Sequence, residues 1–395
     1  MIRSKTIEIM TLIEKTDVYA PEYLGKTDIL IGGGKILAVG NNLIDQRLSK
    51  IDMEIIDGSG LKTIPGLIDG HVHIAGSGGE GGPSTRTPEL QLSQMLRAGV
   101  TTVIGLLGTD GMTRNLEGVL MKVKSLRAEG VSAWMYTGAY QVPTPTILGD
   151  VGRDISLIDE IIGVGEVAIS DHRSSEPSVR ELIRMAVHAR IGGMFSGKSG
   201  IVNLHIGNRK NPFDLIYKAV ERSDLQFTQF LPTHCNRNDH LLAEAKTYGK
   251  TGYIDLTAYP KEYGYENNKA SRAVVELLAA GVPLNHITVT SDGCGSLPVF
   301  EEGKLIKLGI GSPDAIFHTL IELVGDEGMP WEKALPVVTS NPADILKLTN
   351  KGRIAVSKDA DLVLLDDKNE IEYLFANGAI MTREGKLLRK GTFED

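Results

Sequence analysis

One stretch of the sequence decides the expected fold and chemistry: Thr63-Ile64-Pro65-Gly66-Leu67-Ile68-Asp69-Gly70-His71-Val72-His73. It is an apolar run that ends in two histidines one residue apart. Side chains alternate between the two faces of an extended strand, so His71 and His73 point the same way and could share a metal ion. A helical zinc site would need histidines four residues apart, as in H-E-x-x-H, and the 395 residues contain no such pattern. An isolated H-x-H pair can also be two solvated histidines beside a turn. The rest of the chain must distinguish this interpretation from a metal site.

The composition indicates an ordinary globular protein. Hydrophobic residues make up 42% and charged residues 23% of the chain, which gives no reason to expect disorder. The net charge of -8 disfavours nucleic acid and an anionic membrane surface as partners, because neither attracts an acidic body. Charges interrupt the first nine residues, and the two cysteines, Cys235 and Cys294, are too few for a disulfide framework. We therefore expect a cytoplasmic protein that acts on a small molecule and binds neither nucleic acid nor membrane.

From residue 63 onward, short apolar runs alternate with longer amphipathic stretches, which is typical of repeated strand and helix units in a parallel sheet. Eight units favour an α/β fold of the closed (β/α)8 type, a TIM barrel, whose functional residues lie at the C-terminal ends of the strands. Helices are expected between the strands, for example at 87–98 and 178–189. The predicted strands are residues 63–73, 101–108, 133–140, 166–171, 201–205, 230–234, 253–259 and 287–292.

The two ends of the chain differ from its middle. Residues 1–62 and 346–395 contain short alternating runs separated by glycine turns, such as 29–37 and 361–365. We predict that these two segments together form one small β-sandwich domain. The barrel would then comprise residues 63–345.

Potential metal ligands lie at the ends of four predicted strands: His71 and His73, then His205, His234 and Asp292. Imidazole nitrogens and carboxylate oxygens are ligands that zinc prefers. Five ligands exceed the three of a typical catalytic zinc site, so we expect two zinc ions per subunit. Glu166, on the fourth strand, could bridge them, although an acidic residue can also simply be solvated.

Two bridged cations would change the chemistry of water between them. The pKa of that water would fall from ~15.7 towards ~7, which gives a hydroxide nucleophile at neutral pH. Asp292 could accept the proton as general base and later protonate a leaving amine as general acid. The alternative is that Asp292 only binds metal.

The combined motifs resemble the amidohydrolase superfamily. They are the segment 65–73, the two later histidines, Thr290-Ser291-Asp292-Gly293, and the stretches 350–354 and 359–363. More narrowly, the segments 79–80, 83–89, 105–110, 170–174 and 231–234 resemble the isoaspartyl dipeptidase family, and the likeness spans essentially the whole chain. The resemblance implies a two-zinc barrel enzyme that hydrolyses β-aspartyl dipeptides, with the five ligands named above, and a homo-oligomer expected to be an octamer.

One residue departs from the family pattern. The family has a lysine on the fourth strand that is carboxylated by carbon dioxide and bridges the metals, whereas this chain has Gly165-Glu166-Val167 there. Glutamate presents the same carboxylate on a shorter arm. No carbamate is therefore expected. We expect the replacement of lysine by glutamate to affect the spacing and the affinity of the metals more than the type of reaction.

A β-aspartyl dipeptide carries one ammonium and two carboxylates, so its site needs one acid and several cationic or hydroxyl donors. Glu80, in a glycine-rich loop, is predicted to bind the ammonium, and Arg173 and Arg237 the carboxylates. Tyr140 is predicted to donate a hydrogen bond to the oxyanion that forms during attack. Three further residues are expected to complete the substrate site: Gly78, Thr109 and Ser296.

Two other patterns near the site are interpreted as non-functional. Residues 76–81 fit G-x-G-x-x-G, but the acid Glu80 would repel a pyrophosphate, so a dinucleotide site is rejected. The glycines instead let the backbone approach the substrate. His172 alternates away from Asp171 and Arg173 and is expected to lie outside the site.

Two alternatives to a dipeptidase stay open. One is another amidohydrolase, such as a cyclic-amide hydrolase or an N-acyl amino acid deacylase. The other is a non-catalytic scaffold that kept the barrel and lost its chemistry when lysine became glutamate.

Overall fold

A computed structural model describes residues 10–43, 52–260, 268–301 and 304–394. Parts of the predicted small domain, residues 1–9, 44–51 and 395, lie outside the described residues. So do residues 261–267 and 302–303 of the predicted barrel.

Parallel strands form the centre of the molecule, as the sequence predicts. Six of them build one sheet in the order β11-β10-β9-β8-β7-β6, and β12 and β13 form a parallel pair. Apart from the half-buried Trp134, every residue in these eight strands is buried, which explains why they read as continuous apolar runs. Their bounds are β6 Leu67–Val72, β7 Val100–Gly105, β8 Ser132–Thr137, β9 Ile161–Ile169, β10 Ile201–Ile206, β11 Phe230–Thr233, β12 Ile254–Thr257 and β13 Ile287–Thr290.

The β12–β13 pair contacts both edges of the six-stranded sheet. Next to β11, the backbone N–H of Cys235 donates to the carbonyl of Asp255 at 3.1 Å. On the other side, Val72 of β6 forms a parallel bridge with Gly293, and the N–H of His73 donates to the carbonyl of Gly293 at 2.9 Å. The strand ends that carry the predicted ligands therefore lie near one another.

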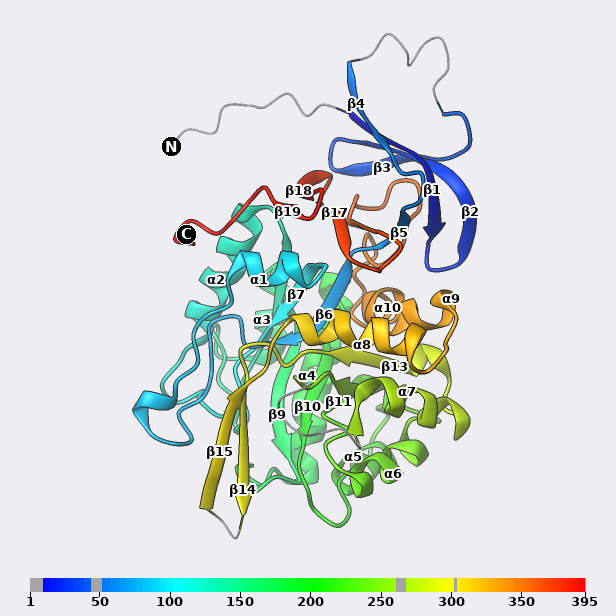
Figure 1. The fold of residues 1–395 in the computed structure, drawn as a ribbon. Coiled ribbons are helices and arrows are strands. Elements are labelled where there is room, and N and C mark those ends of the chain that lie inside the picture. The colour runs from blue at the N-terminus through cyan, green and yellow to red at the C-terminus, as the bar shows by residue number, and fades with distance from the viewer. Residues whose placement is uncertain (1–9, 44–51, 261–267, 302–303, 395) are drawn as a thin grey trace.

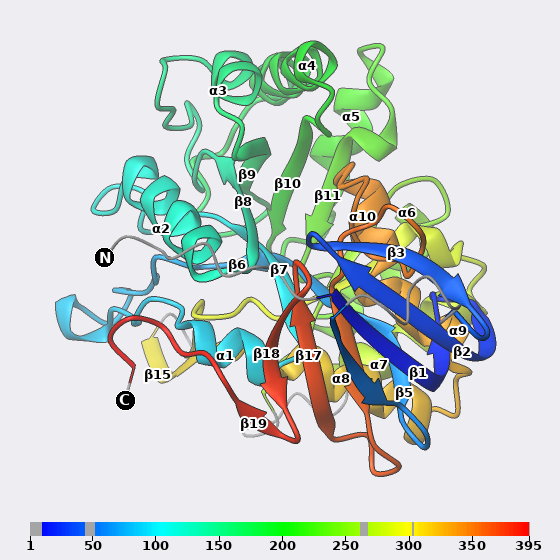
Figure 2. The same cartoon turned by 90° about the horizontal axis from the view of Figure 1, so that it is seen from above.

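Helices connect these strands and cover their outer side (Figures 1 and 2). Side chains cap several of them: Asn115 accepts from Gly118 at the start of α2, and Ser178 and Glu181 form a capping box at the start of α4. The helices are α1 Leu92–Arg97, α2 Leu116–Glu129, α3 Val151–Leu157, α4 Val179–Ser196, α5 Asp214–Glu221, α6 Asp239–Tyr248, α7 Ala270–Ala279, α8 Asp314–Gly325, α9 Trp331–Ala334 and α10 Ser340–Ile345.

Strands from both ends of the chain form a second sheet, seen at the top of Figure 1. It has nine strands in the order β19-β18-β17-β16-β5-β1-β2-β3, with β4 also paired to β1. The strands are β1 Met10–Tyr19, β2 Tyr23–Gly32, β3 Lys35–Gly40, β4 Met53–Asp57, β5 Lys62–Pro65, β16 Leu362–Leu365, β17 Ile371–Ala376, β18 Ala379–Arg383 and β19 Lys386–Leu387.

Alternation along β16 shows how this sheet is buried on two sides. Leu362 and Leu364 join an apolar cluster made by the terminal segments alone, whereas Val363 and Leu365 join the large core around the parallel strands. Successive side chains of a strand face opposite ways. The terminal sheet therefore has its own core on one face and packs on the central core with the other.

Several predicted boundaries were wrong, and the differences near the site are these. The strand predicted at 63–73 is divided at Gly66 between β5 of the terminal sheet and β6 of the parallel sheet. The fourth strand begins at Ile161, five residues before the predicted start, so Glu166 lies within a buried strand. The helix predicted at 87–98 begins at Leu92, because the backbone N–H groups of Thr87 and Leu90 donate to the carbonyls of Ser77 and Ile74.

The hairpin of β14 Ser296–Glu301 and β15 Lys304–Ile310 was not predicted, and it extends away from the terminal sheet in Figure 1. Among the described residues, no helix has the length and apolar character needed to cross a bilayer.

Candidate metal centre and substrate cavity

His71 and His73 lie at the C-terminal end of β6 and point toward Asp292. Both histidines are buried, with 0% and 4% of their surface exposed. Their Nε2 atoms lie 3.6 and 3.2 Å from Oδ1 of Asp292, which follows β13. The alternation predicted from the sequence therefore places these two rings beside the same carboxylate.

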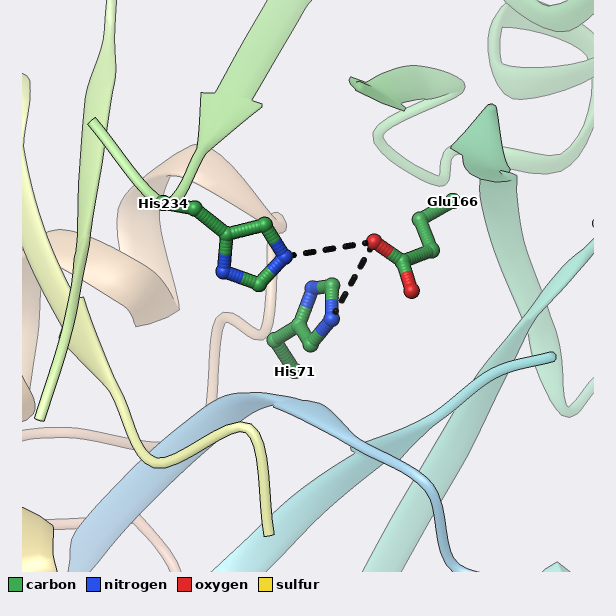
Figure 3. A group of neighbouring side chains, drawn as sticks. All are labelled: His71, Glu166 and His234. Atoms are coloured by element: carbon green, nitrogen blue, oxygen red, sulfur yellow. Dashed lines mark hydrogen bonds and ion pairs between the residues drawn. The ribbon is translucent and has the colours of Figure 1, made fainter. Parts of the chain in front are cut away.

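Glu166 lies between two pairs of histidines. Its Oε1 is 3.4 Å from Nε2 of His73, and its Oε2 is 3.6 Å from Nε2 of His71. The same Oε2 is 3.1 Å from Nδ1 of His205 and 3.4 Å from Nε2 of His234. Figure 3 shows the Glu166 carboxylate directed at both His71 and His234. This placement is compatible with a bridging carboxylate.

Several of these buried atoms lack a hydrogen-bond partner among the described residues. They are both ring nitrogens of His71, Nδ1 of His73 and Oδ1 of Asp292. Buried polar atoms are nearly always paired, so these atoms are available to a ligand such as a cation. Two sets of three ligand atoms are close enough to hold a cation, namely His71, Glu166 and His234, and His71, His73 and Asp292. The residues fit a divalent cation.

The carboxylates and histidines of the cluster shift each other's pKa values. Burial lowers the pKa of His73, but the carboxylates of Asp292 and Glu166 outweigh burial and raise this pKa to about 10. Burial raises the pKa of Glu166 and Asp292, yet the neighbouring histidines outweigh it and hold both pKa values below the usual range. The two carboxylates are therefore ionised and attract positive charge into a buried site.

His234 behaves as a neutral ligand should. Burial lowers its pKa to about 3, despite the hydrogen bond to Glu166. Its Nδ1 lies 2.7 Å from the hydroxyl of Thr257, which leaves Nε2 facing Glu166. Such a second contact fixes the orientation of a ligating ring.

Tyr140 and Asp171 contact His205 from two sides. The Tyr140 hydroxyl is 2.6 Å from Nδ1 of His205, and Asp171 Oδ2 is 3.0 Å from Nε2. Burial raises the pKa of Tyr140 well above its usual value, so its hydroxyl keeps its proton and can donate it. Asp171 was not among the predicted site residues. Its position directly after the fourth strand and two residues before Arg173 was the signal, because functional residues of such folds follow the C-terminal ends of strands.

A cavity of about 220 Å³ lies next to the histidines and is lined by most of the predicted site residues. Gly78 and His71 do not line it, whereas His172, expected outside the site, does. The predicted residues that line it are His73, Glu80, Thr109, Tyr140, Glu166, Arg173, His205, His234, Arg237, Asp292 and Ser296.

Glu80 is held through one oxygen only. Its Oε1 accepts hydrogen bonds from the hydroxyls of Thr109 at 3.1 Å and Ser296 at 2.8 Å, and lies 3.6 Å from Arg173. Its Oε2 is buried and has no hydrogen-bond partner among the described residues. A buried carboxylate oxygen without a donor is a place for a cationic ligand group.

The two arginines face the cavity around Asp171. Arg173 donates from Nε and from a terminal nitrogen to the two oxygens of Asp171, at 3.0 and 3.1 Å, and Arg237 lies 3.6 Å from Oδ2. Burial raises the pKa of Asp171, but His205 and Arg173 outweigh burial and hold it far below the usual range. Both guanidinium groups line the cavity beside Asp171, so either can also contact a ligand anion there.

Gly78 shapes the loop that carries Glu80. It has a φ of 81°, and a Cβ atom there would lie 2.5 Å from the carbonyl oxygen of Thr85. Gly78 therefore shapes the loop and does not line the cavity.

Two further buried carboxylates support the ligand-bearing strands and were not predicted. Asp255 accepts hydrogen bonds from the hydroxyls of Thr233 at 2.6 Å and of Thr288 and Thr290 at 2.7 Å. Asp69 accepts from the backbone N–H of Ser291 at 3.1 Å. Burial raises their pKa values to about 6 and about 7, respectively, against these hydrogen bonds. Asp255 thus joins the ends of β11, β12 and β13.

Known proteins with similar sequences and structures share this arrangement of elements. The amidohydrolase family pattern matches residues 226–382. A dihydroorotase from Lactobacillus gasseri is 25% identical over 92% of this chain and 91% of its own, and a dihydropyrimidinase structure from Brevibacillus agri, 16% identical, has a similar fold (TM-score 0.66, 97% of both chains). The crystal structure of beta-aspartyl dipeptidase from Fervidobacterium islandicum in complex with the β-Asp-Leu dipeptide is 41% identical, covers 100% of both chains and has a TM-score of 0.93. The chain therefore belongs to the amidohydrolases and, within them, to the beta-aspartyl dipeptidase family.

Proposed function

We propose that this protein is a binuclear, zinc-dependent hydrolase of β-aspartyl (isoaspartyl) dipeptides. One observation carries the proposal: a single small cavity combines an unpartnered carboxylate oxygen of Glu80, two guanidinium groups and a cluster of histidines around Glu166. These charges complement the ammonium and the two carboxylates of a β-aspartyl dipeptide. The bound β-Asp-Leu in the Fervidobacterium structure supports the same substrate class.

Six residues would hold the two zinc ions: His71, His73, Glu166, His205, His234 and Asp292. Glu166 has one oxygen toward His73 and the other toward His205 and His234, so it is the proposed bridge. Two cations so placed would lower the pKa of a water molecule towards ~7 and polarise the scissile carbonyl.

The protein's own groups would bind and orient the dipeptide. Oε2 of Glu80 accepts hydrogen bonds from the substrate ammonium, while Arg173 and Arg237 bind carboxylate groups. Thr109 and Ser296 fix the other oxygen of Glu80, which keeps Oε2 directed at the ligand.

Proton transfer would fall to Asp292, and stabilisation of the oxyanion to Tyr140. Asp292 is ionised because the histidines lower its pKa, so it can accept a proton from the attacking water and deliver it to the leaving amine. Tyr140 keeps its proton and can donate a hydrogen bond to the oxyanion. Removing one such donor typically costs about 10²- to 10³-fold in kcat.

We further propose that the eight parallel strands close into a (β/α)8 barrel over residues 63–345. The bridge between Val72 and Gly293 and the contact of Cys235 with Asp255 support closure. Residues 1–62 and 346–395 would form one small β-sandwich domain, which the separate apolar cluster of the terminal segments supports. A cytoplasmic homo-oligomer, an octamer, that binds neither nucleic acid nor membrane completes the proposal.

Metal analysis combined with a substrate panel tests the function. The purified protein should contain two zinc ions per chain and release leucine from β-Asp-Leu. N-Succinyl-leucine, which is β-Asp-Leu without the ammonium, should be a much poorer substrate. Hydrolysis of dihydroorotate or hydantoin in preference to β-Asp-Leu would favour a cyclic-amide hydrolase. Protein without bound metal and without activity would favour a scaffold.

A further inference from the structure

We infer that Arg114, which does not line the cavity, is a positioning residue that sets the place of Glu80 and thereby the selectivity for a substrate ammonium. Arg114 lies in the segment between β7 and α2, and its side chain is 16% exposed. The inference rests on the proposed role of Glu80. It concerns how the chain holds that carboxylate and not the zinc centre.

The loop that carries Glu80 has little regular structure of its own. Between His73 and Thr87 the structure has a short 3-10 turn, Pro83–Thr85, and an isolated bridge between Gly78 and Arg86. Such a loop moves easily unless groups outside it bind its backbone. Some of its bonds are internal, such as that from the backbone N–H of Thr87 to the carbonyl of Ser77 at 2.9 Å, and the position of Glu80 depends on these bonds and on contacts from other segments.

Arg114 binds the base of this loop on both sides. Its guanidinium donates to the carbonyl oxygens of Ala75, of Ser77 at 3.3 Å and of Thr87 at 3.3 Å. Ala75 and Ser77 lie on the incoming side of the loop, and Thr87 lies on the outgoing side. One planar group thus joins the two ends of the segment that presents Glu80.

The same side chain also connects the loop to Thr109. Nε of Arg114 lies 2.5 Å from Oδ2 of Asp110, the residue after Thr109. The Thr109 hydroxyl in turn donates to Oε1 of Glu80. On the other side, Ser77 accepts from the backbone N–H of Ser296, whose hydroxyl is the second donor to Oε1. Thr109 lies next to the residue that pairs with Arg114, and Ser296 is bonded to the loop that Arg114 holds, so both donors to Oε1 are connected to Arg114 and Oε2 is left for the ligand.

The chemistry requires a guanidinium. Arginine offers five N–H donors in a rigid fork, whereas lysine offers three donors from one point. Lysine at 114 could keep the ion pair with Asp110 but could not reach three carbonyls on both sides of the loop. Methionine would also leave the buried Asp110 carboxylate without its cation.

Kinetics with two matched substrates test the inference. In Arg114→Met, kcat/KM for β-Asp-Leu should fall by about 10²-fold, because a shift of about 1 Å in a binding group has that effect. The loss should appear mainly in KM. With N-succinyl-leucine, which has no ammonium for Glu80 to bind, kcat/KM should stay within about twofold. Arg114→Lys should lie between wild type and Arg114→Met and provides a folded variant if the methionine variant fails to fold.

A double-mutant cycle separates positioning from loss of structure. If Arg114 acts through Glu80, Arg114→Met should have little further effect in a Glu80→Gln background. The matched control is Arg127→Met: Arg127 donates to the carbonyl of Ala133 at 2.7 Å and pairs with Glu160, away from the cavity, so substrate preference should not change.

Two negative results have different meanings. Equal loss on both substrates, or the same loss with and without Glu80, would overturn the inference while the dipeptidase function stands. Wild-type protein that does not distinguish β-Asp-Leu from N-succinyl-leucine would instead overturn the proposed role of Glu80.

Discussion

Gly108 offers the most direct test of the metal cluster, because a single methyl group there would enter it. A Cβ atom at this position would lie 2.8 Å from Cε1 of His73 and 3.0 Å from Oε1 of Glu166. An ordinary contact begins near 3.4 Å, so the His73 ring would have to move by about 0.6 Å and the carboxylate by about 0.4 Å. Both groups are buried and cannot turn into solvent.

The expected losses of activity and of zinc affinity follow from these displacements. A misplacement of about 1 Å reduces rate by about 10²-fold, so Gly108→Ala should lower kcat/KM for β-Asp-Leu on the order of 10-fold or more. Zinc affinity, measured by competition with a chelator, should fall by about 10- to 100-fold, as for other disturbed ligand supports.

The control is a glycine with open space around it. For Gly325, at the end of α8, no atom of the described residues outside its own helix turn lies within 4 Å of where a Cβ would be, so Gly325→Ala should leave zinc affinity and activity unchanged. A folded Gly108→Ala variant with wild-type zinc affinity and activity would refute the proposed arrangement of His73 and Glu166 around metal.

Further predictions concern the bridge and the terminal sheet. Because Glu166 supplies a carboxylate without carbon dioxide, metal-depleted protein given zinc should regain full activity in bicarbonate-free buffer, and a requirement for bicarbonate would contradict the bridging role. Lys351, 3% exposed, pairs with Asp361 at 2.6 Å and Asp359 at 2.8 Å, so Lys351→Met should lower the free energy of unfolding in urea by about 3–5 kcal/mol. The exposed pair of Lys218 with Asp214 is the control, and Lys218→Met should cost less than about 1 kcal/mol. Burial raises the pKa of Asp359, but Lys351 and Lys35 outweigh burial and lower it, so its contribution to stability is present above the unfolded pKa of about 3.9 and is lost as pH falls through the lower folded value. Acid titration of Lys351→Met should show a smaller loss in that range than wild type, and an unchanged acid transition would contradict this assignment.

Strand alternation was enough to bring together the residues proposed as metal ligands. Two histidines at i and i+2 on β6 must face one side, and in parallel strands the C-terminal ends lie at one edge. His205, His234 and Asp292 were identified by the same rule, since each follows an apolar run. These residues lie close together in the structure, as expected. The expectation needs only the local backbone conformation and the direction of the strands, and both can be inferred from the sequence.

Alternation gives a wrong prediction where a strand ends earlier than the apolar run in the sequence indicates. His172 was placed outside the site on the assumption that the strand continues past Asp171. In the structure β9 ends at Ile169 and Ser170 has a φ of 57°, so the chain turns and His172 reaches the cavity. The contacts of Arg114 and Asp255 could not be predicted either, since they join segments distant in sequence through carbonyls and hydroxyls that have no sequence signature.

The pairing of β5 with β16 has a consequence for synthesis on the ribosome. Among the residues that the structure describes, the antiparallel neighbour of Lys62–Pro65 is Leu362–Leu365, about 300 residues later. At about 5–20 residues per second, the nascent chain carries that uncovered strand edge for about 15 to 60 s, and free edges of this kind invite aggregation. The growing chain is therefore exposed to aggregation at this edge until residues 362–365 have been made.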